Sequence, residues 1–118
     1  MMSKTSTALL IKFIMTFAFA WIAFRLIDGN AFGQIVLLSI IATAVNYIAG
    51  DLIVLPKFGN IVASIGDGGM GAIVAYIMAL ILPTFVVSAT SLIIFLTFIA
   101  IGEYFFHQYL LKAEKVAP

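Results

Sequence analysis

The sequence predicts an all-α integral membrane protein with four membrane-spanning helices. Its 118 residues are 64% hydrophobic and only 9% charged, with a mean hydropathy of +1.24. Ordinary soluble domains carry about 25% charged residues, so a soluble fold could not cover this much apolar side-chain surface. Four apolar stretches each reach the roughly 20 residues that a helix needs to cross a bilayer. They span residues 8–27, 32–53, 61–82 and 85–106.

Short turn sequences separate the four stretches. Asp28-Gly29-Asn30 follows the first, residues 55–60 (Leu-Pro-Lys-Phe-Gly-Asn) follow the second, and Pro83-Thr84 follows the third. Gly, Pro and Asn at such positions favour turns and end helices. The connections are too short to hold another domain, so we expect residues 1–118 to form a single four-helix transmembrane domain.

The basic residues are distributed unevenly between the two ends of the predicted helices. If four helices alternate in direction, one end carries Lys4, Lys12, Lys57, Lys112 and Lys115. The other end carries Arg25 alone. Because basic residues in short loops are retained in the cytoplasm, we expect both the N-terminus and the C-terminus to be cytoplasmic.

Charged residues inside the apolar stretches give the strongest lead to function. Near the predicted cytoplasmic face, each helix carries one of them: Lys12, Asp51, Asp67 and Glu103. An ionisable group in hydrocarbon is costly and is kept mainly where it faces protein or water. Two polar residues lie within about one helical turn of this set, Asn46 before Asp51 and His107 after Glu103. The candidate polar cluster therefore comprises Lys12, Asn46, Asp51, Asp67, Glu103 and His107.

Small residues mark a packing face on the third helix. Gly71, Ala75 and Ala79 follow Asp67 at intervals of four, which places them on one helix face. Small residues let another helix backbone approach closely within a membrane. Such stripes also offer faces for a second copy of the chain, so we expect a homo-oligomer, with a dimer as its simplest form.

Two four-residue segments indicate an internal repeat. Ile48-Ala49-Gly50-Asp51 ends near the boundary of the second stretch, and Ala100-Ile101-Gly102-Glu103 lies late in the fourth. Both segments place an acid directly after Gly at the same end of a helix. This pattern favours two helical hairpins related by a parallel repeat.

Composition excludes several classes of function. The chain has no cysteine, so disulfides, thiolate metal sites and cysteine nucleophiles are absent. A net charge of +1 and the lack of any run of Lys and Arg exclude binding to nucleic acid. Glu103 and His107 lie one turn apart, but bound zinc usually needs three or four protein ligands. We expect neither a metal site nor a cofactor, and we place His107 at the membrane interface.

Two further patterns resemble enzyme motifs, but the surrounding structure that each motif requires is not predicted here. Residues 66–71 match Gly-x-Gly-x-x-Gly, but no βαβ unit surrounds them, so nucleotide binding is rejected. These glycines are expected to allow close helix packing or a local break in the third helix. Asp51 and Asp67 resemble the paired aspartates of intramembrane aspartyl proteases, but those enzymes have more helices and a larger cavity. We therefore expect no enzymatic activity.

Three segments of the chain resemble a known family. They are Leu10-Ile11-Lys12-Phe13, residues 50–60 (Gly-Asp-Leu-Ile-Val-Leu-Pro-Lys-Phe-Gly-Asn) and residues 102–107 (Gly-Glu-Tyr-Phe-Phe-His). They are similar to the YndM-like group, small four-helix membrane proteins of unknown function from Bacillus-type bacteria. The resemblance implies the four-helix architecture and a bacterial plasma membrane, but no activity. Its matched positions include Lys12, Asp51, Pro56, Asp67, Glu103 and His107.

Two interpretations of the polar cluster remain open. In the first, the protein is a small transporter or ion-conducting homo-oligomer, and the cluster is an ion or proton site open to the cytoplasm. One Lys faces three carboxylates, so at least one acid must be protonated or otherwise compensated. In the second, the protein is a non-transporting scaffold or accessory subunit that binds another membrane protein. Lys12 then pairs with the carboxylates to fix the register between helices.

Overall fold

The computed structural model describes the backbone of residues 4–116 and the side chains of residues 5–109 and of Lys112. Every element in this part of the chain is helical, so the predicted all-α class is confirmed. The elements are α1 (Lys4–Ala20), η1 (Trp21–Ile27), α2 (Phe32–Val45), η2 (Asn46–Val54), α3 (Leu55–Ile81) and α4 (Ala89–Val116). The segments η1 and η2 are π-helices that directly continue α1 and α2. The side chains of Lys4 and Lys115 lie outside the described residues.

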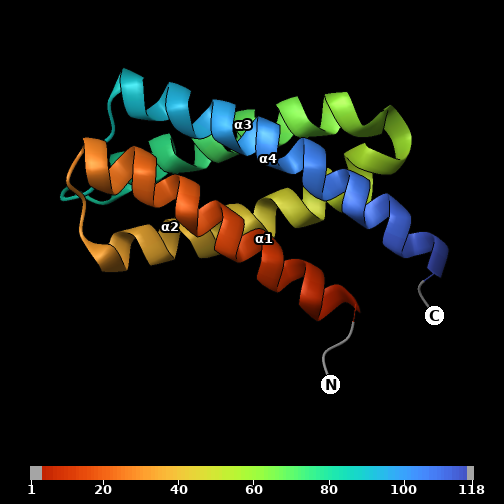
Figure 1. Ribbon diagram of the computed structural model, residues 1–118. Helices are drawn as coiled ribbons and strands as arrows, with labels where there is room; N and C mark the ends of the chain where they lie inside the picture. Colours follow the sequence, from red (N-terminus) through yellow and green to blue (C-terminus); the bar gives the residue numbers. More distant parts are fainter. Residues whose placement is uncertain (1–3, 117–118) are drawn as a thin grey trace.

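Three helices in the described part of the chain are long and apolar enough to cross a membrane. They run over Thr5–Ile27, Phe32–Ile81 and Ala89–Tyr109, with 23, 50 and 21 residues. The longest is interrupted at Gly59, whose φ of 86° and ψ of 176° are not helical. Glycine reaches this backbone region because it has no Cβ. The chain turns back on itself at this point, so the 50-residue stretch forms two arms (Figure 1).

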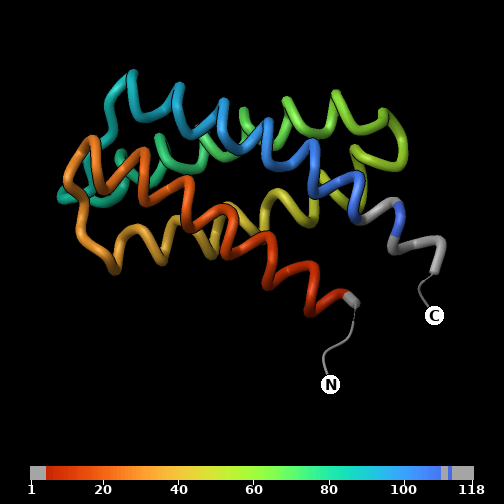
Figure 2. The backbone as a smooth tube through the Cα atoms, viewed as in Figure 1, coloured from red at the N-terminus to blue at the C-terminus, as the bar shows by residue number. Residues whose placement is uncertain are grey.

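We call α1 with η1, α2 with η2, α3, and α4 the four rods of the bundle. They lie side by side along the molecule (Figures 1 and 2). Helix α3 packs against α4, α1 against α2, α1 against α4, and α2 against α3. The start of α1, the end of α4 and the turn at Gly59 lie at one end of the bundle, which we call the terminal end. The connections formed by residues 28–31 and 82–88 lie at the opposite end, the loop end.

Towards the loop end, the bundle interior is apolar and aromatic. The Phe24 ring lies edge-to-face against Phe95, with a centroid distance of 4.9 Å, and Phe85 lies 5.8 Å from Phe24. Ile35 and Leu38 of α2 are fully buried in the same core. Contacts of this kind are stabilised by apolar burial and by the preference of aromatic rings for tilted pairs.

The outer surface of the bundle is also apolar. Large exposed hydrophobic side chains occur along all four rods, among them Ile14, Ile40, Ile65 and Ile93. The interior of the bundle, in contrast, contains several fully buried charged groups. A protein that faces lipid shows this distribution, because apolar side chains are soluble in hydrocarbon and charged ones are not.

Glycines on α3 allow the close packing that the sequence predicts. A Cβ added at Gly68 would lie 2.5 Å from the backbone oxygen of Leu96, and one at Gly71 would lie 3.1 Å from the Phe95 ring. Ala75 is fully buried on the same face, and Ala79 is half-buried. This stripe therefore packs within the chain, largely against α4, and its use as a dimer face was a wrong prediction.

The predicted local break at residues 66–71 is also wrong, because α3 is helical throughout this segment. In the described residues, only Gly29 and Gly59 have a positive φ. The glycines at 66–71 are tolerated in a regular helix, since two of them contact a neighbouring helix closely. The break occurs instead within the predicted turn after the second apolar stretch.

Helix α4 begins at Ala89, whereas the prediction placed its start at residue 85. Ser88 explains the difference. The Ser91 backbone N–H donates to Ser88 Oγ at 3.1 Å, and the Ser88 N–H donates to Ser91 Oγ at 2.9 Å. These reciprocal bonds satisfy N–H groups that have no partner at a helix start. Residues 85–88 remain in the connection.

Candidate functional site

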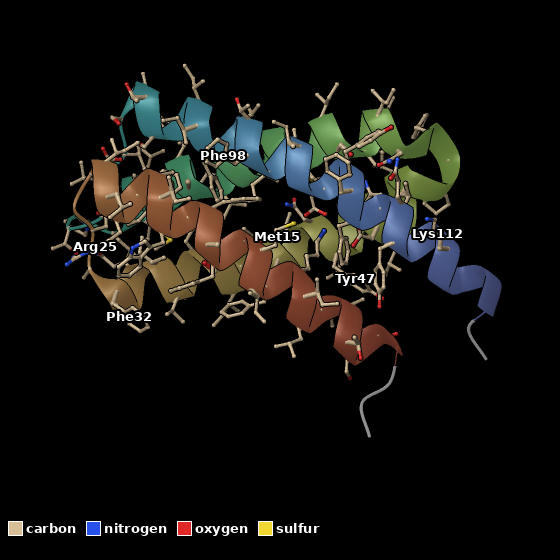
Figure 3. The ribbon with its side chains drawn as sticks, viewed as in Figure 1. Met15, Arg25, Phe32, Tyr47, Phe98 and Lys112 are labelled. Carbon is tan, nitrogen blue, oxygen red and sulfur yellow. The ribbon has the colours of Figure 1, made fainter. Side chains whose placement is uncertain are left out.

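The ammonium group of Lys12 contacts three carboxylates inside the bundle. Lys12 projects from α1 and is fully buried. Its Nζ lies 2.5 Å from Glu103 Oε2, 3.2 Å from Asp51 Oδ2 and 4.0 Å from Asp67 Oδ2. The three acids come from α4, η2 and α3, so every rod of the bundle contributes one charged residue. Nitrogen and oxygen atoms of buried side chains gather between the helices near the Met15 label in Figure 3.

His107 completes this group of side chains. Its Nε2 lies 2.9 Å from Asp51 Oδ1, 3.0 Å from Asp67 Oδ2 and 3.6 Å from Glu103 Oε1. Glu103 thus turns one oxygen to Lys12 and the other to His107. Asp51 Oδ1 lies near both, 3.4 Å from Lys12 Nζ and 2.9 Å from His107 Nε2. His107 is fully buried and faces the bundle interior, as its membership of the predicted polar cluster requires. Residues i and i+4 share a helix face, and Glu103 therefore carries His107 into the interior with it.

The orientation of the His107 ring is set by Asn60. The Asn60 amide nitrogen donates to the backbone oxygen of Tyr104 at 2.9 Å, which leaves its oxygen directed at His107 Nδ1, 2.8 Å away. Ser64 Oγ donates to the same amide oxygen at 3.0 Å. An amide oxygen only accepts, so this network assigns the proton to Nδ1. In a neutral ring, Nε2 then presents a lone pair to the carboxylates.

Asn60 and Ser64 are site residues that our sequence interpretation missed. A signal for them was present, because Asn60, Ser64, Asp67 and Gly71 follow one another at intervals of four, three and four. Such intervals place residues on one helix face. Extending the small and polar stripe of the third helix towards its N-terminus would have included both residues.

Asn46 and Asp51 lie on the π-helix η2, a feature that nothing in the sequence predicts. Hydrogen bonds from residue i to i+5 widen each turn, so Asn46 and Asp51 come to the same side of the helix. Both are buried, with exposed fractions of 0% and 6%. Gly50 lies between them, and a Cβ there would overlap the Asp67 carboxylate. The missing side chain of Gly50 gives Asp67 its space.

Several buried polar atoms at the site have no hydrogen-bond partner among the described residues. They are both amide atoms of Asn46, both carboxylate oxygens of Asp67, Glu103 Oε1, Asp51 Oδ2 and the hydroxyls of Thr16 and Thr43. A buried polar group without a hydrogen bond costs about 1–3 kcal/mol. Ion-pair contacts compensate part of this cost for the carboxylates, but Asn46 has no such contact. The site therefore has unused capacity to bind a polar or charged group.

The structure brings together five of the six residues predicted for the polar cluster. Lys12, Asp51, Asp67, Glu103 and His107 form one network of ion pairs. Asn46, the sixth, is buried on the same π-helix as Asp51 but makes no hydrogen bond through its side chain. One ligand atom from each of Asp51, Asp67, Glu103 and His107 lies within 4.8 Å of the other three.

Comparison with known proteins identifies relatives of this chain. A family model described as "Protein of unknown function (DUF2512)" matches residues 3–116. The chain is 29% identical over 117 residues to the "Uncharacterized membrane protein YndM" of Bacillus subtilis (strain 168). That alignment covers 92% of this chain and 62% of the relative, so the chain spans less than two thirds of the relative's length. No solved structure matches the chain.

The resemblance to the YndM-like group is confirmed by this match. The relative's name and the long apolar helices together support a multi-pass membrane protein, as the composition predicts. Neither the description of the family nor the name of the relative assigns an activity. The function must therefore be inferred from the polar cluster.

Proposed function

Because the chain belongs to the DUF2512 family of proteins of unknown function, we propose its function from the polar cluster. We propose that the protein transports or conducts protons or other small cations, and that the polar cluster holds the cation during passage. The observation that most strongly supports this function is the burial of three carboxylates around a single ammonium group. Ionisable groups inside a membrane protein commonly mark an ion pathway or a proton relay.

The charge balance of the polar cluster supports a role in binding cations. Asp51, Asp67 and Glu103 can together carry three negative charges, and Lys12 supplies one positive charge. Uncompensated charge is costly in a low-dielectric interior. Protons or another cation must therefore supply the remaining positive charge, and a group that takes up and releases such a cation is suited to transport.

We propose a topology of four spans with both termini in the cytoplasm. The break at Gly59 divides the 50-residue apolar stretch into two arms, each long enough to cross the bilayer. The start of α1, the end of α4 and the Gly59 turn share one end of the bundle, as an even number of spans requires (Figure 1). Lys57 precedes this turn, and basic residues favour the cytoplasm.

The two helical hairpins fit the proposed parallel repeat. Gly50-Asp51 ends the first hairpin and Gly102-Glu103 lies late in the second, and both acids contact Lys12. We propose that the two hairpins derive from one ancestral unit. Related hairpins around a shared binding site are a known design of transporters.

We propose a homo-oligomer in the bacterial plasma membrane, because four helices enclose little space for a transport pathway. An apolar groove of about 360 Å³ lies between α2 and α3 on the surface, and we propose that side chains from a helix of a second copy pack into it. The residues that line it are Leu37, Ile41, Val74, Ile77, Met78, Ile81 and Leu82. Interfaces between membrane helices are stabilised by such close van der Waals packing.

The alternative function is that of a non-transporting scaffold or accessory subunit of another membrane protein. It is favoured by the contribution of one charged residue from each rod, because the ion pairs then hold all four rods in register. A buried ionic network can specify one arrangement of helices. In this case the partner would bind the apolar outer surface, and the cluster would not exchange cations.

Flux measurements separate the two functions. Purified protein is placed in proteoliposomes, and proton and cation flux is followed under an imposed gradient. Asp67→Asn and Glu103→Gln remove one charge each with little change of shape. Asp28→Asn is the matched control, because Asp28 accepts a hydrogen bond from Ser88 Oγ at 2.9 Å and makes no ion pair with the cluster. The connections formed by residues 28–31 and 82–88 lie at the loop end (Figure 1).

We expect flux in the native protein and in Asp28→Asn, and loss of flux in Asp67→Asn and Glu103→Gln while both stay folded. Gel filtration and circular dichroism check the fold of each variant. Absence of flux in the native protein under every gradient would overturn the transport function. If Asp67→Asn and Glu103→Gln also unfold or dissociate, the scaffold function is favoured instead.

A further inference from the structure

We infer that Asp51, Asp67, Glu103 and His107 form a binding site for a divalent transition-metal cation of the zinc class. This inference rests on the proposed role of the polar cluster in holding cations, and it names the chemical class of one such cation. It also revises our expectation from the sequence, which considered only the pair Glu103 and His107. The structure adds two aspartates from other helices to that pair.

The ligand set is complete in number and close to the required size. Zinc binds three or four protein ligands through nitrogen at about 2.0–2.1 Å and carboxylate oxygen at about 2.0–2.2 Å. In the tetrahedral arrangement that zinc prefers, ligand atoms are therefore about 3.3–3.6 Å apart. Here one atom from each of the four residues lies within 4.8 Å of the other three, so side-chain rotations that move these atoms by about 1 Å would close the set.

His107 presents the correct atom to the carboxylates. Its Nδ1 is bound to Asn60 Oδ1 at 2.8 Å, and Asn60 is itself held by the Tyr104 backbone. A metal-binding histidine usually donates its second ring N–H to a protein oxygen, which fixes the tautomer and directs the other nitrogen at the metal. His107 Nε2 lies 2.9–3.0 Å from Asp51 Oδ1 and Asp67 Oδ2, between which the ion would bind.

Lys12 shares only part of the ligand set with a metal. Its Nζ is closest to Glu103 Oε2 and Asp51 Oδ2, whereas Glu103 Oε1 faces His107. It also lies 3.4 Å from Asp51 Oδ1 and 4.0 Å from Asp67 Oδ2, so a bound ion would displace it from these two oxygens. One ammonium and one divalent cation also neutralise three carboxylates completely, with His107 uncharged. Without a metal, protons on His107 or on the carboxyl groups supply the remaining positive charge. A divalent cation would replace these protons.

Asn46 provides an independent observation that points to a ligand. It is fully buried, and neither its amide oxygen nor its amide nitrogen has a hydrogen-bond partner in the described residues. The π-helical spacing places it on the side of η2 that carries Gly50 and Asp51, and Asp67 packs against Gly50. Water bound to such an ion would give this amide hydrogen-bond partners, since zinc sites with an open position hold a water molecule.

Direct binding measurements test this inference. The purified protein in detergent is stripped with EDTA and titrated with Zn²⁺ by calorimetry, and Co²⁺ is then used to read the ligand geometry from its visible absorption. We expect saturable binding of one ion per chain and a Co²⁺ spectrum of a site with nitrogen and oxygen ligands. His107→Gln and Glu103→Gln should abolish both signals, and Asp28→Asn should leave them unchanged.

Asn60→Ala provides a second test of the metal site in case His107→Gln does not fold. This variant retains all four ligands but releases the His107 ring, so affinity should fall about 10–100-fold. Absence of saturable Zn²⁺ binding, or binding that His107→Gln and Asn60→Ala leave unchanged, overturns the metal site. Flux without metal binding would overturn this inference alone. Metal binding without flux would overturn the transport function and leave the metal site intact.

Discussion

Lys12 Nζ lies 2.5 Å from Glu103 Oε2, although the two residues are 91 positions apart in the sequence. This ion pair joins the first rod of the bundle to the last, and both side chains are fully buried. The Lys12 ammonium also lies 5.0 Å from the centre of the Phe106 ring, where a cation–π interaction adds to its stabilisation. Removal of this one charge should therefore affect the whole bundle.

Lys12→Met should strongly destabilise the protein. It leaves Asp51, Asp67 and Glu103 without their ammonium partner, and breaking a buried ion pair typically costs about 3–5 kcal/mol. Thermal unfolding in detergent, followed by circular dichroism, measures the effect. Lys57→Met is the matched control, because Lys57 is exposed, and a surface change of this kind is expected to stay within about 0.5 kcal/mol.

The double variant Lys12→Met with Glu103→Gln tests whether the cost comes from charge. Removing one carboxylate charge along with the ammonium should restore part of the lost stability, so the two changes should be non-additive. The loss of unfolding free energy caused by Glu103→Gln is measured in the native chain and again in Lys12→Met. If the loss is the same in both, the ion pair does not stabilise the bundle.

Gly68→Ala should destabilise the α3–α4 contact, whereas Gly69→Ala should not. The added methyl group at Gly68 would lie 2.5 Å from the Leu96 backbone oxygen, which cannot rotate away. Overpacking of this kind costs about 1–3 kcal/mol. Nothing lies within 4 Å of the corresponding position at Gly69, where alanine should add about 0.5–1 kcal/mol of helix stability. We expect the unfolding temperature to fall in Gly68→Ala and to rise in Gly69→Ala, relative to the native chain. Equal shifts in the two variants would contradict this prediction.

The charged part of the site could be predicted from the sequence because its residues share two independent properties. Lys12, Asp51, Asp67 and Glu103 lie at similar depth in four apolar stretches, and Asp67 also begins a stripe of small residues. Burial in hydrocarbon is unfavourable for each charge alone. Mutual contact is the arrangement that reduces this cost, so depth and helix face together predicted that these side chains meet.

Other features of the structure have little or no signal in the amino-acid sequence. The π-helix η2 differs from an α-helix by a one-residue shift of hydrogen bonds, and this shift has no characteristic residue type. Helix α4 starts at Ala89 because of the Ser88 cap, which the apolar pattern from residue 85 onward concealed. His107 was predicted as a member of the polar cluster because it shares a helix face with Glu103.

Gly59→Ala should strain the turn that divides the 50-residue apolar stretch. Gly59 has a φ of 86° and a ψ of 176°, a region that is essentially restricted to glycine, and residues held there cost about 1–3 kcal/mol. No atom lies within 4 Å of the added Cβ, so the effect would come from the backbone alone. Gly66→Ala, inside regular helix with equally open space, is the matched control. A Gly59→Ala protein as stable as the native one would show that the turn adopts another conformation.

Gly50→Ala should weaken cation binding without changing any charge. The added Cβ would overlap the Asp67 carboxylate, whose Oδ2 lies 3.0 Å from His107 Nε2. Asp67 must then rotate away from Gly50, which we expect to change its distance from His107. We expect a folded protein with lower affinity for Zn²⁺ and lower flux, and Gly66→Ala should match the native chain in both. Native flux and affinity in Gly50→Ala would mean that the position of the Asp67 carboxylate is unimportant for cation binding.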